Sequence, residues 1–192
     1  MPVRYLKPGE NIIAVEVHQA NGTSSDLSFD LDFYQEYQAV ASSNLPLIHI
    51  TTSLIIPDEP KVTALMKIIY NGPGKVNSLS DPATDYDGFI GIERRGSTSQ
   101  DLSNKKPYGV ELRDAQGNNL DTALLGMPRE HDWILLAPYS DKTMMRDALA
   151  YILAGKMMDY APRVRFCELY INNTYQGVYI LTEKIKIGRA HV

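Results

Sequence analysis

Two adjacent lysines, Lys105 and Lys106, follow a loop of small residues near the middle of the chain. The loop, residues 95–104, includes three hydroxyl side chains in a row: Ser97, Thr98 and Ser99. Hydroxyls and backbone N–H groups of such a loop can donate hydrogen bonds to phosphate oxygens, and a lysine ammonium adds a point charge. The pattern is typical of a phosphate-binding hairpin, although a solvated hairpin with a serine-rich turn explains the same residues.

Strand patterns flank this loop. Residues 89–94 and 108–113 alternate apolar and polar side chains, which favours a β-hairpin. Similar β-branched or alternating runs occur at residues 45–56, 61–71, 133–136, 164–171 and 177–183. Strands on both sides of a single helix predict an α+β fold with an antiparallel sheet.

The helix is predicted at residues 142–158. Ser140 and Asp141 precede it as caps, and Pro162 follows its end. Its apolar residues recur at three- and four-residue spacing: Met144, Met145, Ala148, Leu149, Ile152 and Leu153. A stripe of this kind is typical of a core, so we expect the helix to pack on the sheet through it.

Composition excludes several classes of protein. The hydrophobic share of 44% and the charged share of 22% are ordinary for a globular domain, and the net charge of −4 provides no basic field for nucleic acid. The single cysteine, Cys167, excludes an internal disulfide framework and a cysteine-rich zinc site, and its strand-like surroundings predict a buried thiol. No apolar run approaches the roughly 18 residues of a membrane span.

Other candidate groups have simpler explanations. His131 and Asp132 suggest an acid–base pair, but neighbours on an extended chain point to opposite faces, which argues against a joint role. Asp81, Asp85 and Asp87 could bind calcium, and turn chemistry explains them equally well.

The first residues resemble part of another module. LKPGENIIAVEVHQ and SSDLSFDLDF are similar to the last strands of jelly-roll, galactose-binding-like modules that occur beside extracellular catalytic domains. We therefore expect residues 1–39 to be the remnant of a β-sandwich and residues 40–44 to be a linker.

Residues 45–186 resemble the N-terminal part of the CotH kinase family, the spore-coat kinase-like proteins. Five blocks carry the resemblance: GIERRGSTSQ, KKPYGVELRDAQG, LLGMPREHDWILLAPYSDKTMMRDALAY, YAPRVRFCELYIN and YQGVYILTEKIK. It implies an antiparallel sheet with one main packed helix, like the N-lobe of an atypical kinase. It also implies a protein outside the cell or at its surface, which transfers the γ-phosphoryl of ATP to Ser or Thr of secreted or coat proteins. A non-catalytic adhesin on the same scaffold is the alternative.

The resemblance also implies roles for particular residues, with ATP and Mg²⁺ as cofactors. Lys105 or Lys106 would pair with the α- and β-phosphates. The hydroxyl loop, which comprises Ser97, Thr98 and Ser99, would cover the phosphates, and Glu183 would lie near the adenine.

The catalytic carboxylate and the metal ligands of such a kinase belong to its C-lobe. No Asp-containing motif follows Lys186, so we assign no catalytic or metal-binding residue and expect an inactive fragment. The remaining residues, 187–192, read IGRAHV, and codons for this hexapeptide match a widely used sequencing adapter. We expect these six residues to be read-through from the adapter.

Overall fold

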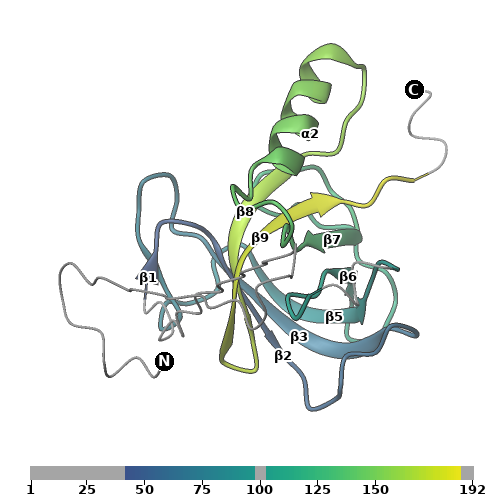
Figure 1. Ribbon diagram of the computed structural model, residues 1–192. Coiled ribbons are helices and arrows are strands. Elements are labelled where there is room, and N and C mark those ends of the chain that lie inside the picture. Colours follow the sequence, from purple (N-terminus) through teal and green to yellow (C-terminus); the bar gives the residue numbers. More distant parts are fainter. Residues whose placement is uncertain (1–41, 98–102, 187–192) are drawn as a thin grey trace, which may run out of the picture. The chain divides into compact units, whose positions relative to one another are not determined.

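Seven strands form a closed barrel in the computed structural model, which describes residues 42–97 and 103–186 (Figure 1). Around the barrel the order is β2 (Leu47–Thr51), β3 (Val62–Ile69), β5 (Tyr86–Arg94), β6 (Tyr108–Arg113), β7 (Asp132–Leu136), β9 (Thr174–Glu183) and β8 (Val164–Ile171). A separate two-stranded sheet pairs β1 (Ser42–Ser43) with β4 (Asn77–Ser78). The predicted strands are thus present, but they close into a ring.

Alternation along each strand separates the inside of the barrel from its outside. On β5, Ile90 and Ile92 are buried and face the interior. Phe89, the residue before Ile90, lies on the outer face and is 42% exposed. The interior is filled by apolar side chains from every strand of the barrel, as in other small barrels. Trp133 on β7 belongs to this core, and its indole N–H donates to the Glu130 carbonyl at 3.0 Å.

The barrel closes through a parallel pair, β2 with β8. Leu47 lies opposite Glu168, and Ile50 lies opposite Ile171. Every other neighbouring pair in the barrel is antiparallel. Because strands far apart in the sequence make the closing contact, the local patterns that reveal each strand do not reveal the ring.

A two-residue turn joins β8 to β9. Asn172 and Asn173 both have positive φ, 49° and 64°, as a type I′ turn requires. The turn is tighter than the sequence pattern predicted, and β9 starts at Thr174 and not at Gly177.

The expected fold class, an α+β sheet with one main packed helix as in a kinase N-lobe, is wrong. The described residues are mostly β, and the sheet is a closed barrel with a parallel closing pair. The β-sandwich remnant predicted at residues 1–39 and the tail at 187–192 lie outside the described residues, and residues 42–43 of the predicted linker form β1.

The helix, α2 (Arg146–Met157), lies beyond one end of the barrel beside β8 (Figure 1). It buries Ala148 against Val164 and Ile180. Most of the predicted core stripe is instead exposed: Met144, Met145, Leu149, Ile152 and Leu153. The prediction that this stripe packs on the sheet was therefore wrong.

Within residues 42–97 and 103–186, no helix has the length and apolar character needed to cross a membrane.

The start of α2 is shifted relative to its predicted position. Asp141 accepts hydrogen bonds from the backbone N–H groups of Thr143 and Arg146, at 3.0 and 2.8 Å. These bonds hold residues 141–145 in a turn before the helix, and they lower the pKa of the Asp141 carboxyl to about 2. Asp141, which was predicted as a cap, thus organises the turn before the helix. The helix itself begins at Arg146, four residues later than predicted.

Adjacent residues of β3 provide a test of the barrel. Met66 is 1% exposed and faces the core, while its neighbour Leu65 is 44% exposed on the outer face. Met66→Ala is expected to lower the free energy of unfolding by about 2–5 kcal/mol, because it leaves a cavity. Leu65→Ala should cost less than about 1 kcal/mol. Urea denaturation measures both, and equal costs would contradict the inward orientation of Met66.

Candidate functional site

A pocket of about 300 Å³ lies at one end of the barrel, which is a common place for ligand sites in such folds. It is bordered by the β2–β3 connection, the end of β5, the start of β6 and the β8–β9 turn. The lining residues are Thr52, Leu54, Ile55, Ile56, Arg94, Lys106, Tyr108, Ile171, Asn172 and Gln176. Its described lining therefore combines apolar side chains with two cations and contains no carboxylate.

Arg94 reaches the pocket because it ends the inward-facing series on β5. Ile90, Ile92 and Arg94 are spaced by two residues, so all three point to the same face of the strand. Arg94 lies directly opposite Tyr108 on β6, which also lines the pocket. Burial raises the pKa of the Tyr108 hydroxyl, and the nearby positive charge of Arg94 opposes that shift.

Lys106 is the second cation of the pocket. Its backbone carbonyl accepts a hydrogen bond from the Tyr179 hydroxyl at 2.9 Å. Tyr179 is a core residue of β9, so this bond fixes the segment that carries Lys106 to the wall of the barrel. The structure thus places one of the two predicted phosphate lysines in the pocket.

Lys105 has a different position. Its ammonium donates to the Val178 carbonyl at 2.6 Å and lies 4.9 Å from the centroid of the Tyr179 ring. Burial lowers the pKa of Lys105, and the charge of Glu168 partly opposes this effect. Ser103 supports the same segment, because its hydroxyl accepts the Lys105 N–H at 2.9 Å. Lys105 therefore anchors the segment that presents Lys106.

Among the other predicted site residues that the structure describes, Ser97 and Glu183 do not line the pocket. Ser97 is exposed just after β5, and Thr98 and Ser99 lie outside the described residues. Glu183 is buried, and its carboxylate accepts hydrogen bonds from Arg163 at 3.1 Å and from the Tyr160 hydroxyl at 3.2 Å. About 16 Å of extended strand separates Glu183 from Val178. Glu183 therefore lies at the end of β9 that is far from the pocket.

Residues 92–190 match the sequence model of the family described as CotH kinase protein. The match covers just over half of the chain and includes both cations of the pocket. The chain belongs to the CotH kinase family. This result confirms the resemblance seen in the sequence blocks. No curated protein matches the chain.

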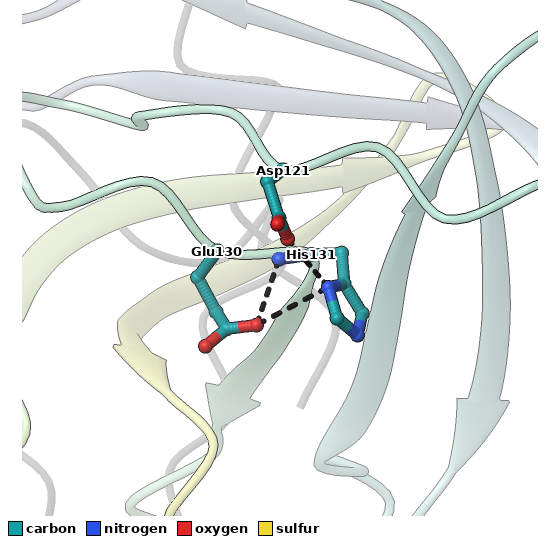
Figure 2. Close-up of side chains that lie close together, drawn as sticks. All are labelled: Asp121, Glu130 and His131. Atoms are coloured by element: carbon teal, nitrogen blue, oxygen red, sulfur yellow. Dashed lines mark hydrogen bonds and ion pairs between the residues drawn. The ribbon is translucent and has the colours of Figure 1, made fainter.

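A second polar group of this CotH family member surrounds His131 (Figure 2). The ring Nδ1 lies 2.5 Å from an oxygen of Asp121 and 3.4 Å from Oε1 of Glu130. The other ring nitrogen, Nε2, lies 3.4 Å from Asp132, because residue 131 precedes the regular part of β7. The side chains of His131 and Asp132 therefore lie close together, although the strand pattern places neighbours on opposite faces.

Lys186 completes this group from beyond the end of β9. Its ammonium contacts Glu130 at 2.7 Å, Asp132 at 3.1 Å and Nε2 of His131 at 3.3 Å. An ammonium only donates, so a hydrogen bond from Lys186 to Nε2 requires the tautomer in which Nδ1 carries the proton and donates to Asp121. Oε1 of Glu130 and both ring nitrogens are thereby engaged. The group fixes the end of β9 to the start of β7.

The remaining carboxylates and the cysteine have structural partners. Asp81 accepts the Ser78 N–H at 2.9 Å, which is turn chemistry, and also accepts from the side chain of Asn71 at 2.8 Å. Asp85 instead accepts the Leu125 N–H at 2.9 Å, a contact between segments 40 residues apart in the chain. Cys167 is fully buried, as predicted, and burial raises the pKa of its thiol to about 12.

Sequence reasoning missed Arg94. The signal that could have revealed it is the period-two spacing that places Arg94 on the buried face of its own strand. A charged residue at a position that the pattern assigns to the core needs a partner or a ligand.

The Glu130 carboxylate predicts how stability depends on pH. Burial alone would raise its pKa, but hydrogen bonds from Lys186 and from two backbone N–H groups outweigh burial and lower the pKa to about 2. Since the pKa in the folded protein lies below the ordinary glutamate value of 4.5, the stabilisation is complete above pH 4.5 and is lost as pH falls toward 2. Its size is of the order of 2 kcal/mol.

Glu130→Gln should remove this contribution, so the variant is less stable than wild type at pH 7 and the difference shrinks between pH 4.5 and 2. Chemical denaturation at several pH values measures the effect. Glu59→Gln, at an exposed position, is the matched control and should leave the stability within about 0.5 kcal/mol. A difference for Glu130→Gln that does not change with pH would contradict the assignment.

Proposed function

We propose that this chain is the nucleotide-binding part of an ATP-dependent Ser/Thr protein kinase whose substrates are secreted or coat proteins. The observation that carries the proposal is the pocket at the barrel mouth, whose two cations lie within the residues that the CotH family match covers. A cationic pocket with an apolar wall suits a nucleotide, because the phosphates require positive charge and the base requires apolar contact.

Lys106 supplies the charge for the phosphates in this proposal. Lys106 lines the pocket, and Lys105 contacts the Val178 carbonyl and the Tyr179 ring. Ser97 and the hydroxyl side chains of Thr98 and Ser99 would add donors from the loop after β5. We assign Glu183 to the end of β9 and not to the adenine, because Arg163 and Tyr160 already engage its carboxylate.

The pocket fits ATP better than it fits a metal ion. Mg²⁺ in phosphoryl-transfer sites is held by carboxylate or amide oxygens together with phosphate oxygens. Among the described lining residues there is one amide pair, Asn172 and Gln176, and no Asp or Glu. We therefore propose that this chain binds ATP and does not by itself transfer the phosphoryl group.

A non-catalytic binding module, such as an adhesin, is the second candidate. The exposed apolar face of α2, which includes Met145, Leu149 and Ile152, favours it because monomeric proteins seldom leave a contiguous apolar face in water. Both candidates fit a protein outside the cell or at its surface, which we propose from the family and from the jelly-roll resemblance of residues 1–39.

Titration calorimetry of the chain with ATP tests the nucleotide proposal. We expect wild type to bind ATP, and we expect Lys106→Ala to bind about tenfold more weakly or worse, because a charge-assisted contact is lost. Lys105→Ala should lower the melting temperature and reduce ATP affinity less. Incubation with labelled ATP and a serine-rich protein should give no transfer.

Each outcome has a defined consequence for the proposal. If wild type shows no heat of binding with ATP, the nucleotide role fails and the binding-module candidate gains. If Lys105→Ala weakens ATP binding more than Lys106→Ala does, the assignment of the two lysines is reversed. If labelled phosphate is transferred, the chain is an active enzyme and the proposed inactivity is wrong.

A further inference from the structure

We propose that Arg94 and Lys106 together form a phosphate-binding subsite at the mouth of the barrel, with the partly buried Arg94 as its anchor. The inference deepens the proposed nucleotide-binding function and rests on it for the identity of the ligand. It adds Arg94, a cation that is not part of the predicted pattern of a hydroxyl loop followed by Lys105 and Lys106.

The first observation is the orientation of Arg94. It occupies the next inward position on β5 after Ile90 and Ile92, both of which are fully buried in the core. Most strand positions of this kind in the barrel hold apolar side chains. A guanidinium at the end of such a series is directed across the barrel mouth, where Tyr108 is its cross-strand neighbour.

The second observation is the lack of a partner for the buried part of this side chain. Within the described residues, Nε of Arg94 is buried and has no hydrogen-bond partner. Other arginines of the barrel are satisfied: Arg113 pairs with Glu111 at 2.9 Å, Arg163 pairs with Glu183 at 3.1 Å, and Arg165 donates to the Leu125 carbonyl at 3.2 Å. A buried donor of a charged group normally has an acceptor, so this atom indicates a position where an anion can bind.

The composition of the pocket indicates which anion fits. Arg94 and Lys106 line the same pocket, and no carboxylate is among its described lining residues. A guanidinium presents a planar fork that matches two oxygens of a phosphate, and the lysine adds a point charge. Ile55, Ile56 and Ile171 provide an apolar wall beside the cations, which suits a phosphate carried on an organic body.

The test is calorimetry of the full chain with three probes: ATP, inorganic pyrophosphate and adenosine. Arg94→Gln removes the charge and keeps a side chain of similar length. Arg95→Gln is the matched control, because it changes the net charge equally at the next residue, whose side chain lines a different groove with Glu93 and Lys184. Melting temperatures of all variants report whether the fold is retained.

Wild type should bind ATP and pyrophosphate and bind adenosine much more weakly. Arg94→Gln should weaken both ATP and pyrophosphate by about tenfold or more, without a lower melting temperature, since it removes a donor that has no partner in the free protein. Arg95→Gln should stay within about twofold of wild type for both ligands. Arg94→Lys keeps the charge but not the fork, so its affinity should fall between those of wild type and Arg94→Gln.

Two results would overturn the subsite. One is unchanged pyrophosphate and ATP binding in Arg94→Gln, and the other is an equal loss in Arg95→Gln, which would indicate a general effect of charge. If Arg94→Gln fails to fold, Arg94→Lys decides, and wild-type affinity in that variant would exclude a role for the guanidinium fork. If pyrophosphate binding depends on Arg94 but ATP binds no more tightly than pyrophosphate, the anion subsite is supported and the nucleotide function is rejected.

Discussion

The parallel pairing of β2 with β8 is the contact on which the rest of the structure depends. It joins residues 47–50 to residues 168–171 and closes a sheet of otherwise antiparallel strands into a barrel. Closure removes the two edges of the sheet and leaves a single inner face that must be filled by apolar side chains. The same pairing brings the β8–β9 turn beside the β2–β3 connection, and these segments border the pocket.

At this end of the barrel, the residues that face inward change from apolar to charged, and the pocket lies where they change. Along β5 the series passes from Ile90 and Ile92 to Arg94, and on the facing strand it passes from Val110 and Tyr108 to Lys106. Apolar layers fill the interior and cations occupy the mouth. Core packing therefore positions the charges, since each cation is carried by a strand or segment that the barrel holds in place, and Tyr179 provides such a hold for Lys106.

Membership of the CotH kinase family and the closed barrel must be considered together. The family is one of kinases, whereas the described lining of the pocket holds two cations and no carboxylate. The acidic side chains of Glu130 and Asp132 are bonded instead to Lys186, where they fix the end of β9. These two carboxylates therefore have a structural role in the barrel.

The sequence by itself determined the strands and the family. Alternation located the barrel strands to within a few residues, and five sequence blocks identified the CotH kinases, because both signals are local. The tertiary structure alone decided the ring closure, the exposure of the α2 stripe and the different roles of Lys105 and Lys106. Each of these depends on contacts between residues far apart in the chain. A period of two tells which side of a strand a residue faces, and only the folded chain tells what lies on that side.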